Sequence, residues 1–434
     1  MKTALRVFSV VALAAALVAG CSRRNARLRL VTDEARVGQV PYGADADGAI
    51  VSPDGRRVAF ACGPPRARYL VVDGVQGREY EDVSDVVFSP DSRRVAYLAQ
   101  RGDKQLVIVD GVEGTEYDTV RQGSLLFSPD SKRVAYVAVR GKKQLVVIDG
   151  AEGKEYEPIG PGGPVFSPDS RRVAYSAGRR GGTTPERRFI VVDGAEGKEY
   201  DDIATGVTFS PDSKRVAYAA RRDDTSFAVV DGREQLSYPE IRRLAFSPDG
   251  THLAYEAKLD PRQRGAVLVV DQEEASAPDL SVEDGLSFSR DGTRMAFVAW
   301  RKDEEDNWRQ LVVVDGAARQ DYARVGAPQF SPNGRRVAYT AQGRSPRVRV
   351  VVDGREGPDY DSIRALTFSP DSRHVAYVRV RGEKYAVVVD GVEGKVYDHI
   401  PQACRLTFDG PTKLRILAVL GNEIVRVELT IVER

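Results

Sequence analysis

One ten-residue phrase recurs along this chain and constrains its fold more than any other feature. A clear copy runs from Phe88 to Tyr97 and reads Phe-Ser-Pro-Asp-Ser-Arg-Arg-Val-Ala-Tyr. Nine units of this kind begin near Val51, Phe88, Phe127, Phe166, Phe209, Phe246, Phe288, Phe330 and Phe368, so successive starts are 37 to 43 residues apart. This spacing is the period of a propeller blade rather than of a helical repeat.

Each unit contains four strand signals, as the copy at Leu125–Ile159 illustrates. Leu125–Phe127, Arg133–Ala138, Gln144–Ile148 and Glu155–Ile159 are separated by a Ser-Pro-Asp turn, a variable loop and an Asp-Gly hairpin. The second and third strands are apolar on both sides, which indicates a sheet with both faces covered. Tandem antiparallel sheets of this kind predict an all-β propeller, with Phe127 and Tyr136 packed between blades and the outer strand most polar.

A tenth unit is degraded and is expected to close the ring. It retains Leu406–Gly410, Leu414–Leu420 and Ile424–Val432, while Leu28–Thr32 reads as an unpaired strand near the other end of the chain. We expect this N-terminal strand to complete the last blade, because such sharing removes two open edges. The prediction is a single propeller over residues 28–434, with about ten four-stranded blades.

The repeated unit resembles the WD40-like repeat of TolB-type propellers, also called PD40. The likeness rests on Phe-Ser-Pro-Asp followed by Val-Ala-Tyr, and on the Asp-Gly after the third strand, and it covers about residues 28–434. It implies the propeller fold and is unspecific for function, because such repeats serve unrelated tasks. The chain lacks the separate N-terminal domain that the resemblance to TolB itself would imply.

The first 27 residues predict export and lipid anchoring. A short basic start precedes the apolar stretch Val7–Ala19, which is too short to span a bilayer. Leu-Val-Ala-Gly-Cys at its end resembles a bacterial lipobox, so we expect residues 1–20 to be a signal peptide and Cys21 to carry the lipid. Residues 21–27 would form a short basic tether. An ordinary secretion signal with a chance cysteine is the alternative.

The residue after the lipidated cysteine predicts the membrane. Position 22 is serine rather than aspartate, which in the lipoproteins this signal resembles favours the outer membrane, at its periplasmic face or the cell surface, over the inner membrane. The tether spans at most about 20 Å, so the folded body would stay close to the lipid. Arg23, Arg24 and Arg27 would be attracted to anionic headgroups.

No catalytic or metal constellation stands out, so we expect a non-enzymatic protein without cofactors. There is no Gly-x-Ser-x-Gly elbow or phosphate-binding glycine loop. His252 and His374 replace the second basic residue of the repeated turn, and His399 is placed in an outer strand, so a shared metal site is not expected. The carboxylates recur once per blade, which turn chemistry explains; calcium binding by these turns is a minor alternative.

The two remaining cysteines are expected to be buried. Cys62 aligns with Ala99, Ala138 and Ala177 of other repeats, a small position that favours a free structural thiol. A disulfide with Cys404 is the open alternative, because both cysteines lie near the ring closure.

Charge is balanced overall, with 64 basic and 63 acidic residues, which argues against nucleic acid as a partner. The second–third loops are mostly basic, as in Arg140–Lys143 and Arg344–Arg349, and the third–fourth hairpins are acidic. One hypothesis is a disc with a basic and an acidic face, the basic one meeting an anionic surface. The alternative is that solvated loops simply need charge.

Two loops depart from the repeat and are the candidate partner-binding sites, because irregular loops often hold the specific contact. The first, from Trp300 to Trp308, contains both tryptophans and an acidic run. Trp and Arg are favoured binding anchors, although the indoles could equally pack on neighbouring blades. The second is Gly178–Arg188. The candidate residues are Trp300, Arg301, Lys302, Trp308, Arg309, Arg179, Arg180, Arg187 and Arg188.

These features together favour a lipid-anchored propeller of the bacterial envelope that acts as a monomeric protein-interaction scaffold. A carbohydrate- or peptidoglycan-binding propeller is the alternative, and an enzyme is the third. Aromatic side chains at the channel mouth would favour the carbohydrate reading.

Overall fold

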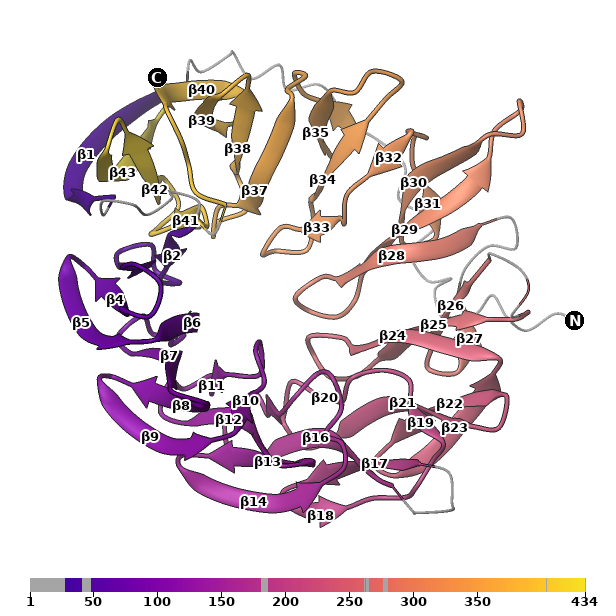
Figure 1. Ribbon diagram of the computed structural model, residues 1–434. Coiled ribbons are helices and arrows are strands. Elements are labelled where there is room, and N and C mark those ends of the chain that lie inside the picture. Colours follow the sequence, from indigo (N-terminus) through magenta and orange to yellow (C-terminus); the bar gives the residue numbers. More distant parts are fainter. Residues whose placement is uncertain are drawn as a thin grey trace, which may run out of the picture.

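The chain folds into ten β-sheets arranged in a ring (Figure 1). The computed structural model describes residues 28–40, 48–180, 186–260, 262, 265–275, 280–402 and 404–433. The signal peptide, Cys21 and the tether lie outside these residues. The described part contains no α-helix, and hence none long and apolar enough to cross a membrane. The prediction of one all-β propeller with ten four-stranded blades is confirmed; in blades 3, 5 and 8 the innermost strand is interrupted and counts as two short segments that pair with the same neighbour.

The blades are numbered in chain order. Blade 1 contains β2 (Ile50–Val51), β3 (Val58–Cys62), β4 (Arg68–Val72) and β5 (Val75–Tyr80). Blade 2 contains β6 (Asp82–Phe88), β7 (Val95–Arg101), β8 (Lys104–Val109) and β9 (Val112–Tyr117). Blade 3 contains β10 (Thr119–Val120), β11 (Leu126–Phe127), β12 (Val134–Arg140), β13 (Lys143–Ile148) and β14 (Ala151–Tyr156). Blade 4 contains β15 (Val165–Phe166), β16 (Val173–Arg179), β17 (Arg187–Val192) and β18 (Ala195–Glu196).

Blade 5 contains β19 (Asp202–Ile203), β20 (Thr208–Phe209), β21 (Val216–Arg222), β22 (Thr225–Val230) and β23 (Arg233–Tyr238). Blade 6 contains β24 (Glu240–Phe246), β25 (Leu253–Lys258), β26 (Val267–Val270) and β27 (Glu273–Glu274). Blade 7 contains β28 (Ser281–Phe288), β29 (Met295–Lys302), β30 (Trp308–Val314) and β31 (Ala317–Ala318).

Blade 8 contains β32 (Arg324–Val325), β33 (Gln329–Phe330), β34 (Val337–Gln342), β35 (Val348–Val352) and β36 (Arg355–Glu356). Blade 9 contains β37 (Ser362–Phe368), β38 (Val375–Arg381), β39 (Lys384–Val389) and β40 (Val392–Tyr397). Blade 10 contains β41 (Thr407–Phe408), β42 (Lys413–Leu420), β43 (Glu423–Val432) and the N-terminal β1 (Arg29–Gln39).

The N-terminal strand closes the ring as predicted, and it is longer than the sequence suggested. β1 runs antiparallel to β43, from Arg29 opposite Val432 to Gln39 opposite Glu423. In Figure 1 it forms the outer edge of blade 10, beside the C-terminus. Because the two ends of the chain share one sheet, the ring cannot open at blade 10 without breaking this ladder.

The repeated phrase builds a turn. In blade 2 the Ser89 hydroxyl donates to the Asp91 carboxylate (2.6 Å) and accepts from the backbone N–H of Arg94 (2.9 Å). The same carboxylate accepts from the N–H of Arg93, and Ser92 adopts a positive φ of 64°. Serine and aspartate are therefore used by the backbone of the turn.

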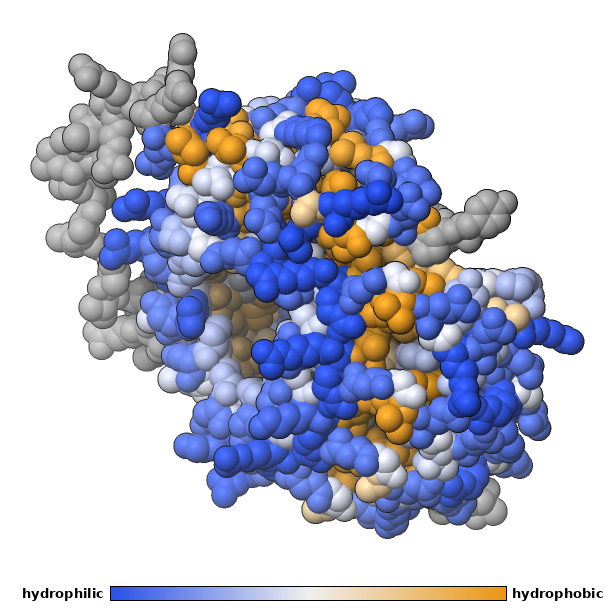
Figure 2. Space-filling view, turned by 90° about the vertical axis from the view of Figure 1, so that its left-hand side faces the viewer, coloured by the Kyte–Doolittle hydropathy of each residue, from blue (hydrophilic) through white to orange (hydrophobic). Residues whose placement is uncertain are grey.

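The core lies between blades. Phe127 and Tyr136 of blade 3 pack with Ala96, Leu98 and Val107 of blade 2, as predicted. The outer strands are the most exposed, as β9 illustrates, since only its last residue is buried. Figure 2 shows the side of the ring that carries β1 and β5, where hydrophilic side chains predominate and apolar ones form narrow strips.

Cys62 and Cys404 are buried free thiols in one apolar cluster around the closing blade, so the disulfide alternative is wrong. Burial raises the pKa of the Cys404 thiol to about 12. The placement of His399 in an outer strand is also wrong. His399 follows β40 and bridges to Val419 of β42, because the chain has already crossed into blade 10.

Candidate functional site: the joint between blades 6 and 7

Most joints of the ring share a set of contacts between one blade and the next, and the first is made by an arginine. In blade 2, Arg94 Nε donates to Asp110 of the same blade (2.7 Å). Its Nη1 donates to the backbone oxygens of Ser131 (3.1 Å) and Lys132 (2.7 Å) in the turn of blade 3. The planar guanidinium can serve both blades at once because it has several donors in a fixed fork. The same bridge to the next blade's carbonyls is made by Arg57, Arg133, Arg172, Arg294 and Arg336.

The second contact is made by the serine that follows the repeated aspartate. The Ser131 hydroxyl of blade 3 accepts from the backbone N–H of Asp91 in blade 2 (2.9 Å). Equivalent bonds join Asp54 to Ser92, Asp130 to Ser170, Asp169 to Ser213 and Asn333 to Ser372. This serine therefore both adopts the turn conformation and forms a hydrogen bond between neighbouring blades.

The third contact lies on the outer rim, where a tyrosine of one blade pairs with a glutamate of the next. Tyr117 of blade 2 donates to Glu152 of blade 3 (3.0 Å) and meets Tyr136 edge to face, with ring centroids 6.3 Å apart. The tyrosine–glutamate bond recurs between Tyr80 and Glu113, Tyr322 and Glu356, and Tyr397 and Glu34. We call these four residues, arginine, serine, tyrosine and glutamate, the joint set.

The joint between blades 6 and 7 has lost the whole joint set. His252 stands in place of the arginine, and Gly292 in place of the serine. Counted from the aspartate of the hairpin, Pro278 stands in place of the tyrosine and Ala318 in place of the glutamate. The chain has no tyrosine at all between Tyr255 and Tyr322. Every other joint between two of the nine complete blades keeps at least three of the four residues, whereas this one lacks all four.

A cleft of about 320 Å³ opens at this joint. Blade 6 contributes Arg242, Glu256, Lys258 and Ala266, and blade 7 contributes Ser281, Val282, Trp300 and Trp308. The small side chain of Ala266 leaves room for this cleft. The residue at its place in the other complete blades is Arg68, Gln105, Gln144, Arg188, Ser226, Gln310, Val348 or Tyr385, all larger than alanine. Where this residue is Gln310, its amide oxygen accepts from the inner strand of the next blade, at Val325 (2.7 Å).

The cleft combines aromatic, anionic and cationic groups. Glu240 pairs with Arg242 and, at 2.9 Å, with Lys258. Glu256 is buried, with only 2% of its surface exposed, where other blades place Leu98, Val137 or Val298. Its charge is compensated by Arg243, whose Nη1 lies 3.3 Å from the carboxylate. No other carboxylate among the described residues is buried to this extent, and turn chemistry does not explain this one, so it belongs to what distinguishes this joint.

Two apolar side chains of these blades are exposed, one of which lines the cleft while the other directly follows a lining residue, Lys258. Trp308 begins β30 and is 47% exposed, and Leu259, directly after β25, is 55% exposed. Large exposed apolar side chains on a polar surface commonly mark a binding site. The structure therefore keeps Trp300 and Trp308 as candidate contact residues.

The predicted basic residues of this loop form ion pairs with nearby carboxylates. Arg301 binds Asp321 (2.8 Å), and Arg309 binds Asp303 (3.0 Å). Lys302 pairs with Asp306 (2.6 Å) and lies over the Trp308 ring, 5.6 Å from its centroid. The acidic run is thus the internal counter-charge that shapes the hairpin and orients Trp308.

The second predicted loop is also held by ion pairs. Arg179 binds Glu196 and Glu199, and Arg187 binds Asp201. Arg180 and Arg188 share Glu186, at 3.5 Å and 2.8 Å. Residues 181–185 lie outside the described part. The structure does not bring these arginines together with the tryptophans, since they belong to blade 4.

The expected separation of charge between the two faces is wrong. Carboxylates that follow the outer strands lie against the basic second–third loops, where Asp118 binds Lys104 and Asp398 binds Lys384 (2.7 Å). On the opposite face, the hairpin aspartates bind the repeated arginine, as in Arg94–Asp110. Counting loop charges alone missed the carboxylates, because they sit at the junction between units.

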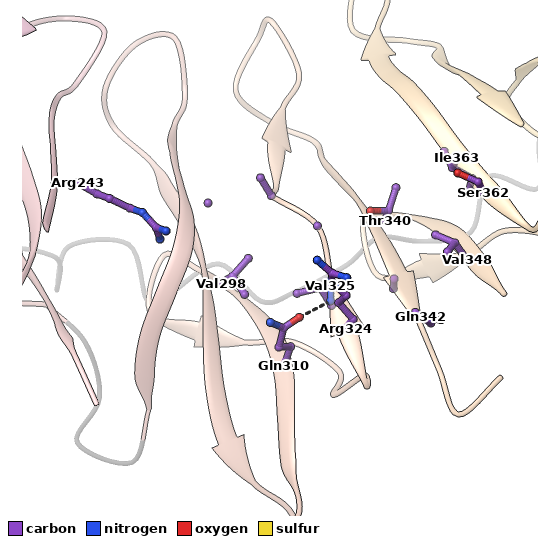
Figure 3. Close-up of a pocket in the computed structure, with 14 residues that line it drawn as sticks. Arg243, Val298, Gln310, Arg324, Val325, Thr340, Gln342, Val348, Ser362 and Ile363 are labelled. Carbon is purple, nitrogen blue, oxygen red and sulfur yellow. Dashed lines mark hydrogen bonds between the residues drawn. The ribbon is translucent and has the colours of Figure 1, made fainter. Parts of the chain in front are cut away.

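A second cavity, of about 500 Å³, lies among the inner strands of blades 6 to 9 (Figure 3). It is lined by polar groups such as Arg324, Thr340 and Gln342, and it contains no aromatic side chain. Figure 3 shows Gln310 directed to Val325, so this side chain already serves the joint between blades 7 and 8. The cleft between blades 6 and 7 is the more distinctive of the two.

Within the described residues, no group of three or more His, Cys, Asp or Glu side chains could hold a metal ion. His252 and His374 take the place of the repeated arginine, with Nδ1 2.5 Å and 2.6 Å from Asp271 and Asp390. Sequence reasoning missed the importance of His252, Ala266, Gly292 and Ala318. A comparison of the repeats joint by joint, rather than unit by unit, would have revealed them.

Comparison with known proteins returns only distant likenesses. A scan against protein-family models and a search of curated proteins both returned no match. A solved structure described as a eukaryotic initiation factor is 13% identical, with a TM-score of 0.49, over 79% of this chain and 96% of its own. The Dos1 propeller is 11% identical, with a TM-score of 0.39, over 80% and 92%. TolB from Acinetobacter baumannii is 13% identical, with a TM-score of 0.27, over 59% and 79%.

Proposed function

We propose that this protein is a non-enzymatic, monomeric binding propeller of the bacterial cell envelope, held by a lipid on Cys21, and that it captures a partner protein at the cleft between blades 6 and 7. The observation that carries the proposal is the convergence of both tryptophans on the one joint between complete blades that has lost the joint set. A residue that departs from the repeat once is free to serve function, whereas one used in every blade is committed to the fold.

The chemistry of the cleft indicates the partner's contact. Trp300 and Trp308 offer flat apolar surface, and the exposed Leu259 directly follows Lys258 of the cleft. Arg242 and Lys258 neutralise Glu240, so the polar wall has no large excess of either charge. This combination suits an apolar or aromatic side chain presented on a loop of the partner, with peptide groups facing the polar wall.

Site-specific photocrosslinking in intact cells tests the proposal. A benzophenone amino acid at position 259 should capture one defined protein, identified by mass spectrometry. The same group at Lys142, in the equivalent loop of blade 3, is the matched control and should not capture that protein. Trp300→Ala combined with Trp308→Ala should abolish the crosslink while the circular dichroism spectrum is retained. Equal capture from positions 259 and 142 would exclude the cleft as the partner site.

One observation favours a second candidate, a carbohydrate or peptidoglycan fragment. Two indoles beside Arg242, Glu256 and Lys258 can stack on sugar rings and bind their hydroxyls. The chain contains only these two tryptophans, so its tryptophan fluorescence reports on this cleft alone. A saturable emission change on titration with soluble peptidoglycan fragments would select this candidate, and the absence of a change would favour the protein partner.

A further inference from the structure

Between the described residues of blades 6 and 7, the packing contacts are mainly apolar. Leu268 and Val270 of blade 6 pack with Val282, Phe297 and Leu311 of blade 7. Among the described residues, two hydrogen bonds from backbone N–H groups cross the joint: Val282 N–H donates to Ala266 C=O (2.8 Å), and Ala266 N–H donates to the Ser281 hydroxyl (3.3 Å). Apolar contact is non-directional, so this joint has less to hold the two blades in a single relative position.

His252 in place of the arginine removes the polar bridge to blade 7 but still pairs with Asp271 of its own blade. Its Nδ1 lies 2.5 Å from Asp271, which reproduces the contact within the blade. The imidazole is shorter than a guanidinium and has no second group that extends to the turn of blade 7. A turn that contains glycine can still accept hydrogen bonds from an arginine, because Arg294 of blade 7 donates to Gly334 O (2.6 Å) and Arg335 O (3.1 Å). The missing bridge therefore follows from His252 and not from Gly292.

The packing around Gly292 also leaves no room for the serine that it replaces. A Cβ added to Gly292 would lie 2.3 Å from the carboxylate of Asp249, so this carboxylate occupies the space that a serine side chain would need. Asp249 is held there by the Ser247 and Thr251 hydroxyls (2.5 Å and 2.7 Å), which keep the pKa of its carboxyl at about 2. Its charge thus faces a glycine of the next blade instead of a hydrogen-bond partner there.

We propose that the joint between blades 6 and 7 is the seam at which the ring opens, and that opening exposes the cleft to its ligand; the second clause rests on the proposed function. The seam is distinct from the closure in blade 10, where β1 and β43 form a continuous ladder. Opening at one joint needs only that its contacts be weaker than those of its neighbours, because each blade is an independent sheet. A partner that contacts both walls would close the seam and rigidify the ring.

Hydrogen exchange of the unmodified protein tests the seam without any ligand. The amide of Val282, which bonds across this joint, should exchange about tenfold or more faster than those of Val120, Ile159 and Val325, which bond to glutamine side chains of the preceding blade. Equal exchange at all four joints would overturn the proposal.

A restored arginine supplies the second test. In a Trp308→Phe background, Trp300 is the only fluorophore of its kind, and its quenching by acrylamide measures access to the cleft. His252→Arg should lower the quenching constant and slow the exchange of Val282, because the guanidinium can bridge to the blade 7 turn. Arg133→His, which removes one bridge at the joint between blades 3 and 4, is the control and should leave both readouts unchanged.

The outcomes separate this proposal from the partner proposal. Neither exchange nor quenching requires a partner, so a failed crosslink at position 259 leaves the seam standing. Unchanged quenching and exchange in His252→Arg, with a native circular dichroism spectrum, would remove the seam and leave the crosslinking result unaffected.

Discussion

Replacing Arg94 by alanine should weaken the joint between blades 2 and 3. The substitution removes the ion pair with Asp110 and both hydrogen bonds to the backbone oxygens of blade 3. It also removes the guanidinium from above the Phe127 ring, where it lies 5.2 Å from the centroid. Asp110 keeps its bond from the Val95 N–H (3.0 Å), so the hairpin of blade 2 should survive.

The magnitude follows from these contacts. The Arg94 and Asp110 side chains are 31% and 41% exposed, so their ion pair contributes about 0.5 kcal/mol. Each hydrogen bond to a carbonyl oxygen contributes about 1 kcal/mol, and the contact with the ring about 0.5 kcal/mol. We therefore expect Arg94→Ala to lower the free energy of unfolding by about 2 to 3 kcal/mol.

Urea unfolding followed by far-ultraviolet circular dichroism measures this loss, with Arg93→Ala as the matched control. Arg93 is the preceding residue, carries the same charge and is exposed, so its replacement should cost less than about 0.5 kcal/mol. If the two alanine variants unfold at the same urea concentration, the bridging arginine does not stabilise the joint.

Four further outcomes are expected. Burial and the bond to Glu113 raise the pKa of Tyr80 from 10.0 to about 12, so the contribution of Tyr80 to stability should be fully present below pH 10 and be lost as the pH rises toward 12; a flat alkaline thermal-melting profile would contradict this. The bond from Lys198 lowers the pKa of Glu234 from 4.5 to about 2, so its contribution should be present above pH 4.5 and disappear as the pH falls toward 2, and Glu234→Gln should flatten that part of the profile. Deleting Arg29–Gln39 should expose the edge of β43 and lower the melting temperature by several degrees, whereas an unchanged melting curve would exclude a closing role for β1. Cys21→Ser should move the protein from the membrane fraction to the soluble fraction, and continued membrane association would refute the lipid anchor.

The repeated phrase was sufficient to predict the architecture. Ser89, Asp91 and Ser92 act within one turn, and strand signals such as Val95–Arg101 are local, so both can be recognised without tertiary information. The ring closure was also predictable, because an unpaired strand at one end and an incomplete blade at the other leave one simple solution. Its length was not, since the pairing of β1 beyond Thr32 depends on β43.

The candidate site was predicted only in part. Trp300 and Trp308 stood out as exceptions in the sequence, but their loop arginine Arg301 also looked like a contact residue until Asp321 of the same blade was seen beside it. The charge of each face could not be read from loops alone, because the neutralising carboxylates lie elsewhere in the chain and meet the loops only in three dimensions.

The sequence by itself determined the fold, because turns, strand periodicity and repeat length act over short distances and are written once in every unit. The tertiary structure decided which departures from the repeat matter. His252, Ala266, Gly292 and Ala318 lie far apart in the chain and look like unrelated substitutions. In the folded ring all four lie on the two sides of one joint. Their combined effect is a cleft between two weakly joined blades, and this cleft forms only when the two blades are side by side.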